Sequence, residues 1–240
     1  MTDTTAHETR REIAGLTARA ERKALNWLAA RMPACIGSDP LTALGLLAMA
    51  AAGLAYAASR HRPCLLHVVN LCLLVNWFGD SLDGTLARFR RRSRPRYGYY
   101  VDHMVDSFGV LMVLGGLALS NHMGAAVAVT LLVLYYLLSI HIYLATHSLG
   151  IFKISFGPVG GTELRILLAL ANMALLFKPR VAVLGTSLPL FDLVGGLAIA
   201  GLLVTLAAAV ASTTARLYRL EPVPRTGACE HPVSGREVSR

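Results

Sequence analysis

The sequence has little charge. Asp, Glu, Lys and Arg make up only 15% of its 240 residues, and 55% are hydrophobic. Soluble domains typically carry about 25% charged residues. The start of the chain also lacks the apolar core of a cleavable signal peptide, because residues 1–24 are polar and charged. The low charge and high hydrophobic content exclude an ordinary soluble domain and predict a protein that spans a membrane.

Cysteine is scarce, and the cysteines form no C-x-x-C pair. Two of them lie in or beside apolar runs, where cysteine behaves as a small apolar residue. The sequence therefore excludes a disulfide framework and a zinc site built on cysteine pairs. The residues concerned are Cys35, Cys64, Cys72 and Cys229.

The formal net charge is +9, but no nucleic-acid-binding motif accompanies it. In membrane proteins an excess of Lys and Arg marks cytoplasmic loops near anionic lipid. We therefore expect membrane lipids, and no nucleic acid, among the partners.

Six apolar runs are long enough to count as membrane spans, since a helix needs about 20 residues at 1.5 Å each to cross. The fifth run is short. The sequence thus predicts an all-α integral membrane fold with six transmembrane helices, preceded by an N-terminal interfacial amphipathic helix. The runs are 41–59, 64–82, 104–121, 124–146, 163–178 and 191–213.

Lys and Arg are unevenly divided between the connections. If the N-terminus lies in the cytoplasm, the cytoplasmic segments hold most of them, and the outer loops hold only Arg60, Arg62, Lys178 and Arg180. The positive-inside rule favours this orientation. The region from residue 79 to 106 then lies at the cytoplasmic face of a multi-pass membrane protein, in the inner membrane if the source is bacterial.

The segment 10–31 has the pattern of an amphipathic helix that lies along the cytoplasmic interface. A helix packed on the protein itself is the alternative. The end of the chain is polar and rich in proline, as disordered tails are. We expect the interfacial helix within 1–36, the transmembrane domain over 37–217 and a disordered cytoplasmic tail over 218–240. The apolar side of the first helix holds Ile13, Leu16, Ala20, Ala24, Trp27 and Leu28.

Four aspartates fall at the ends of two apolar runs, in the stretches GDSLDGTLAR and VDHMVD. A central aspartate in a membrane helix costs roughly 2.5–3.5 kcal/mol, so such residues line a wet cavity, are paired with another group or bind a cation. Asp80 and Asp83 share one helix face, and Asp102 and Asp106 share another. A turn between the helices lets the two faces meet. Four carboxylates without a His–Cys cluster predict a hard cation, Mg²⁺ or Mn²⁺.

Glycine and arginine beside these aspartates suggest phosphate chemistry. Gly84 and Gly98 remove side chains where a ligand must approach a helix, and a glycine within a helix otherwise costs about 1 kcal/mol against alanine. Arg88 lies one turn beyond Gly84 and can hold a phosphate oxygen bidentately. The other arginines up to residue 96 are typical of a cytoplasmic loop.

The run D-x-x-D-G-x-x-A-R-x9-G-x3-D-x3-D, from Asp80 to Asp106, resembles the signature of the CDP-alcohol phosphotransferases. All eight fixed residues are present, although the nine-residue spacer before Gly98 is one longer than the usual eight. The stretch S-D-P-L-T, which ends at Thr42, resembles the P-N-x-L-T of the family only in part, because its asparagine is missing. Six spans behind an interfacial helix also match the family.

The resemblance implies a transferase of phospholipid biosynthesis that moves a substituted phosphate from a CDP-linked alcohol to a second alcohol or lipid and releases CMP. It implies Mg²⁺ or Mn²⁺ as cofactor, in a site of two ions, and a homodimer. Asp106 would complete the metal site or act as the base. The resemblance further assigns metal binding to Asp80, Asp83 and Asp102, the nucleotide pocket to Gly84, Ala87 and Gly98, and phosphate binding to Arg88.

Two substrate branches of the family remain open. His103 within D-H-x-x-D and Glu163 within G-T-E-L-R look like the aminoalcohol branch, in which a histidine and a glutamate assist deprotonation and the acceptor is diacylglycerol. Alternatively, His103 is an ordinary polar residue at a helix start, and Glu163 is an acid favoured by the helix dipole. The other branch combines CDP-diacylglycerol with a small alcohol.

Two other functions use acidic residues in a membrane. Intramembrane prenyltransferases bind pyrophosphate through Mg²⁺, but they have two separated Asp-rich motifs and more spans. A cation transporter would spread its acids across the membrane on several helices. Here the acids gather at one end of two helices, which favours the CDP-alcohol enzyme.

Overall fold

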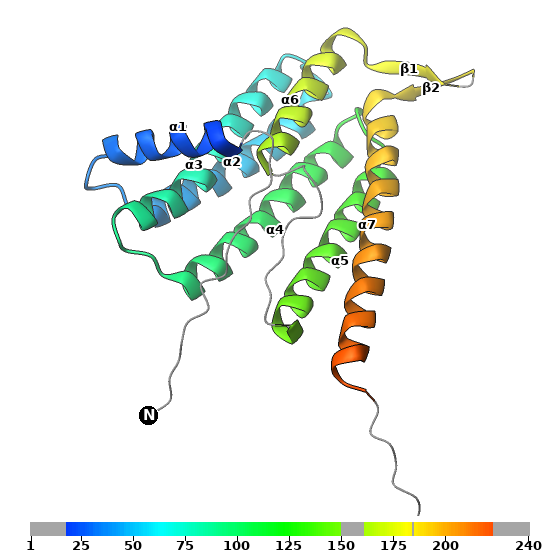
Figure 1. The fold of residues 1–240 in the computed structure, drawn as a ribbon. Helices are drawn as coiled ribbons and strands as arrows, with labels where there is room; N and C mark the ends of the chain where they lie inside the picture. Colours follow the sequence, from blue (N-terminus) through cyan, green and yellow to red (C-terminus); the bar gives the residue numbers. More distant parts are fainter. Residues whose placement is uncertain (1–17, 150–160, 184, 223–240) are drawn as a thin grey trace, which may run out of the picture.

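The computed structural model describes residues 18–149, 161–183 and 185–222. This part of the chain folds into long helices and one short hairpin (Figure 1). The elements are α1 (Ala18–Arg31), α2 (Ser38–Ser59), α3 (Leu65–Phe89), α4 (Pro95–Leu119), α5 (Ala125–Leu149), α6 (Gly161–Phe177), β1 (Arg180–Val183), β2 (Thr186–Pro189) and α7 (Leu190–Leu220).

The predicted membrane architecture is confirmed in its class. Within the described residues, α2, α3, α4, α5 and α7 are long and apolar enough to cross a membrane. The remaining apolar helix, α6, has 17 residues and spans about 26 Å at 1.5 Å per residue, somewhat less than a bilayer core of about 30 Å. The chain is therefore a helical multi-pass membrane protein, and a sixth span at α6 stays a prediction.

A hairpin between α6 and α7 is the one departure from an all-helical chain among the described residues. β1 and β2 pair antiparallel, with Val183 opposite Thr186. Gly185 lies in the turn with a φ of 83°, which a side chain would make costly. Figure 1 shows this hairpin at the opposite end of the helices from the loop that joins α3 to α4.

Helix α2 packs against both α3 and α4, and glycine brings the backbones together. A β-carbon at Gly53 would overlap the carbonyl of Met112 in α4, and one at Gly116 would overlap the carbonyl of Gly53. At the other crossing, a β-carbon on Gly79 of α3 would overlap the backbone of α2 near Gly45. Small residues at such crossings are typical of membrane helices, which gain stability from close packing rather than from water exclusion.

Helix α1 packs on the half of α3 that carries the aspartates. Leu25 and Ala29 are buried in a cluster that includes Leu82 and Leu86 of α3. In the same region, a carboxylate oxygen of Glu21 accepts hydrogen bonds from three donors in α3 and α6. The donors are Trp77 Nε1 at 2.9 Å, Ser81 Oγ at 3.2 Å and Thr162 Oγ1 at 2.8 Å.

The buried side of α1 differs from the predicted apolar side. Leu28 is half-buried, but Ala24 is exposed and Trp27 is 55% exposed, with the Arg31 guanidinium over its ring. The helix thus packs on the protein through one side, and a position along the membrane interface stays a prediction. Residues 10–17 of the predicted helix lie outside the described residues.

The predicted division into segments 1–36, 37–217 and 218–240 stays a prediction. Helix α7 continues to Leu220, three residues past the predicted end of the transmembrane domain at 217. Residues 223–240 of the predicted tail lie outside the described residues.

Candidate functional site

The site begins on the last three turns of α3. Asp83 is only 9% exposed, whereas Asp80 is half-buried. The negative charges of Asp102 and Asp80 both act on Asp83, so the loop from α3 to α4 does bring carboxylates of the two helices near one another. Three like charges in a half-buried place repel, which calls for a cation or for hydrogen-bond donors.

Thr42 supplies one of these donors. Its hydroxyl contacts Oδ2 of Asp83, so the N-terminal end of α2 touches the most buried carboxylate of the site. Sequence reasoning placed Thr42 in a partial family pattern but assigned it no role. The contact gives that pattern a physical meaning.

Arg165 supplies another donor, from α6. Its Nη2 donates to Oδ2 of Asp80 at 2.6 Å, and its Nε donates to Oδ1 of Asn76 at 2.8 Å. The sequence alone predicted no role for Arg165. The stretch G-T-E-L-R, in which it occurs, was the one signal that pointed to it.

Helix α4 presents Asp102 and Asp106, both half-buried, toward different neighbours. Asp102 acts on Asp83, as described above, while the charge of Asp106 acts on Tyr135 and Tyr143 of α5. A hydrogen bond also joins α5 to α4 next to Asp106, because the Tyr136 hydroxyl donates to the Ser107 carbonyl oxygen at 3.0 Å. Asp106 therefore lies near the tyrosines of α5, whereas Asp102 lies near Asp83.

The residues predicted to line the nucleotide pocket lie along α3 and at the start of α4. The guanidinium of Arg88 lies over Gly84, with Nη1 3.3 Å from the position of a β-carbon, and Nη2 donates to Thr85 Oγ1 at 3.2 Å. Ala87 is half-buried. Gly98 is exposed, with no atom within 4 Å of the position that its β-carbon would take. A ligand thus has open space beside Gly98.

His103 and Glu163 lie on different helices. Nδ1 of His103 is 2.7 Å from the Tyr99 carbonyl oxygen, and its ring packs against the rings of Tyr99 and Tyr143. Glu163 is half-buried in the first turn of α6, which packs on α3. A catalytic role for either residue stays a prediction.

The departure from the P-N-x-L-T pattern has its own partner. Asp39 stands where the family usually has asparagine, and its Oδ2 accepts from Nη2 of Arg94 at 2.7 Å. Both side chains are about half exposed, at 53% and 54%. The added carboxylate is thus paired with an arginine of the longer loop between α3 and α4.

The chemistry of the donor set fits a hard divalent cation, because four carboxylates supply only oxygen. Among the described residues, however, no three His, Cys, Asp or Glu side chains are already gathered as a metal site. Asp80 and Asp83 are instead turned to Arg165 and Thr42. The residue types suit Mg²⁺ or Mn²⁺, and their side chains would have to converge on it.

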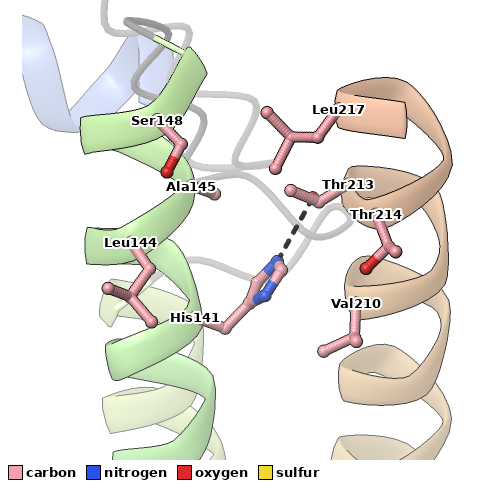
Figure 2. Close-up of a pocket in the computed structure, with 8 residues that line it drawn as sticks. All are labelled: His141, Leu144, Ala145, Ser148, Val210, Thr213, Thr214 and Leu217. Carbon is pink, nitrogen blue, oxygen red and sulfur yellow. Dashed lines mark hydrogen bonds between the residues drawn. The ribbon is translucent and has the colours of Figure 1, made fainter. Parts of the chain in front are cut away.

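A separate cleft of about 90 Å³ lies between α5 and α7 (Figure 2). His141 points into it, with Nε2 3.5 Å from Thr213 Oγ1. The rest of its lining is Leu144, Ala145, Ser148, Val210, Thr214 and Leu217. No predicted site residue lines this cleft, so it is not part of the candidate site.

The comparison with protein families agrees with the motif. Residues 38–213 match the family model described as CDP-alcohol phosphatidyltransferase, which covers α2 to α6, most of α7 and every predicted site residue. No curated protein matches the chain. Members of the family transfer phosphate-containing groups from CDP-linked alcohols in phospholipid synthesis. With this match and the motif on α3 and α4, the chain belongs to the CDP-alcohol phosphatidyltransferase family.

Proposed function

We propose that the chain joins a CDP-linked alcohol to a second alcohol and releases CMP at the site between α3 and α4. The observation that supports this most directly is the position of Asp83. Asp83 is buried within a membrane helix and belongs to the family motif. The negative charges of Asp80 and Asp102 both act on it. A buried carboxylate among like charges suits a residue that holds a cation.

The metal would be held by Asp80, Asp83, Asp102 and Asp106. When bound, divalent cations neutralise charge on the pyrophosphate and on the departing CMP. Arg88 would hold a phosphate oxygen, and the position of its guanidinium over Gly84, beside the aspartates, supports this. Gly84, Ala87 and Gly98 would line the nucleotide pocket, and the open space at Gly98 leaves room for it.

The transfer is a displacement at the β-phosphorus of the donor. The oxygen of the attacking alcohol forms a bond to this phosphorus, and the bond to the bridging oxygen breaks, so that CMP leaves with that oxygen. The proton of the attacking hydroxyl goes to Asp106, which acts as a general base. Tyr135 and Tyr143 of α5 lie near this carboxylate.

The donor and acceptor are either CDP-diacylglycerol with a small alcohol or a CDP-aminoalcohol with diacylglycerol. In the second case, His103 and Glu163 assist deprotonation. The His103 ring packs at a tilt on Tyr99 and edge-to-face on Tyr143. His103 and Asp106 are both in α4, which is compatible with this role.

Release of CMP by the purified full chain in detergent tests the proposal. CDP-diacylglycerol is supplied with a panel of small alcohols, and CDP-choline or CDP-ethanolamine with diacylglycerol, each with Mg²⁺. CMP from one pair alone is expected, and the pair names the branch. A folded preparation that releases CMP from no pair and does not bind CDP would contradict the proposal.

The site is proposed to face the cytoplasm in a chain with six spans, which forms a homodimer. The segments proposed are 1–36, 37–217 and 218–240, with the transferase domain in the middle. The basic loop from residue 89 to 97 supports the orientation. A protease added outside intact cells is expected not to cleave this loop. Cleavage there would contradict the proposed orientation.

A further inference from the structure

Two segments of the chain share the sequence G-T-x-x-R. The first runs from Gly84 to Arg88 in α3, inside the family motif, and the second from Gly161 to Arg165 at the start of α6. In each, the arginine folds back over its own glycine, with Nη1 3.3 Å from the position that a β-carbon would take. The motif assigns a role to Arg88 but none to Arg165.

Arg165 lies within a chain of polar contacts that passes through three helices. Its Nε donates to Asn76, which is only 4% exposed. Nδ2 of Asn76 in turn donates to the Gly45 carbonyl oxygen of α2 at 3.1 Å, beside the close crossing of α2 and α3. The other end of the guanidinium donates to Asp80. The rigid crossing therefore fixes the arginine, and the arginine fixes the carboxylate.

The ion pair itself is largely withdrawn from solvent. The side chains of Arg165 and Asp80 are 18% and 27% exposed. The planar fork of arginine can bond Asn76 and Asp80 at once, which fixes the orientation of the Asp80 carboxylate. Because a carboxylate has two oxygens with several acceptor positions, Asp80 can accept from Arg165 and also ligate a cation.

We propose that Arg165 is a positioning residue of the transferase site that orients Asp80 for the divalent cation. This inference rests on the proposed function, since it takes Asp80 as a metal ligand. Removal of a group that orients a metal ligand typically weakens metal binding by about 10–100-fold. A residue that only stabilised the packing of α6 on α3 would lower the melting temperature and leave the metal affinity of the folded protein unchanged.

The test is Mn²⁺ binding to the full chain in detergent, followed by the electron paramagnetic resonance signal of the free ion. The variants are Arg165→Gln, Arg165→Lys and Asp83→Asn. Arg219→Gln is the matched control, because Arg219 is an exposed arginine in the last turn of α7, which packs on α5.

Arg165→Gln is expected to bind Mn²⁺ about 10–100-fold more weakly than the wild type. Arg219→Gln is expected to bind Mn²⁺ with the wild-type affinity. Arg165→Lys keeps the charge but loses the fork, so an intermediate affinity is expected. Wild-type affinity in Arg165→Gln would overturn the inference. Tighter binding would also overturn it, by showing that Arg165 competes with the cation for Asp80.

If Arg165→Gln does not fold, Arg165→Lys decides, and wild-type affinity in that variant would overturn the inference. Failure of the proposed function gives a different result. In that case the wild type shows no saturable Mn²⁺ binding, or Asp83→Asn binds Mn²⁺ as the wild type does, and the metal assignment itself is lost.

Discussion

Asp83→Asn and Asp106→Asn are each expected to abolish CMP release while the helices stay folded. Asparagine keeps the shape of the side chain but removes the charge that holds a cation at Asp83 and the base at Asp106. Loss of a general base typically lowers turnover by about 10²–10⁴-fold. The measurement is CMP release by each purified variant, with helical content and melting temperature recorded on the same samples.

Asp39→Asn is the matched control for these two variants. It makes the same chemical change near the site, but on a side chain that is about half exposed and paired with Arg94. The substitution restores the residue that the family usually has at this position. We expect Asp39→Asn to retain CMP release. Full activity in Asp83→Asn or in Asp106→Asn would refute the assignment of the site.

Gly53→Ala is expected to have a large effect on folding. Its β-carbon would overlap the Met112 carbonyl, and a backbone atom of a neighbouring helix cannot move aside as a side chain can. Overpacking typically costs about 1–3 kcal/mol, and a clash with backbone should reach at least the upper end. The measurement is the melting temperature in detergent, which should fall well below that of the wild type.

Gly115→Ala provides the comparison for this prediction. Gly115 lies in α4 near the same crossing, but no atom lies within 4 Å of the position that its β-carbon would take. Because alanine favours helix over glycine by about 1 kcal/mol, this variant should melt at or above the wild-type temperature. Equal melting temperatures for Gly53→Ala and Gly115→Ala would contradict the close packing of α2 on α4.

The membrane class and the family could be predicted from the sequence because both leave a local signal. Long apolar runs follow from the thickness of a bilayer, and the family motif is a fixed series of spacings. The spacing of Asp80 and Asp83 also places both on one side of a helix, and Asp102 indeed acts on Asp83 from the next helix. Their roles in metal binding stay predictions.

Contacts between distant segments could not be predicted in the same way. Thr42 meets Asp83 across 41 residues of sequence, and Arg165 meets Asp80 across 85. Such pairs have no periodicity, so a polar residue at a helix end looks the same whether it contacts water or a carboxylate. The partner of Asp39 was hidden for the same reason.

Other features were missed because their residues suit several structures. Gly53 and Gly116 are ordinary small residues in an apolar run until the close approach of α2 and α4 is known. Trp27 was placed on the apolar side of the first helix by its hydrophobicity, whereas α1 packs through Leu25 and Ala29. The hairpin after α6 is too short for a pattern based on long apolar runs to find.

The most direct test of the account is the metal dependence of CMP release. The purified chain is stripped with EDTA and supplied with its donor and acceptor, and Mg²⁺ or Mn²⁺ is then added back, beside the Asp83→Asn variant. The account predicts no CMP from the stripped protein, recovery on addition of the cation and no recovery in the variant. CMP released at an undiminished rate in EDTA, or by Asp83→Asn, would contradict a metal-dependent transferase built on these aspartates.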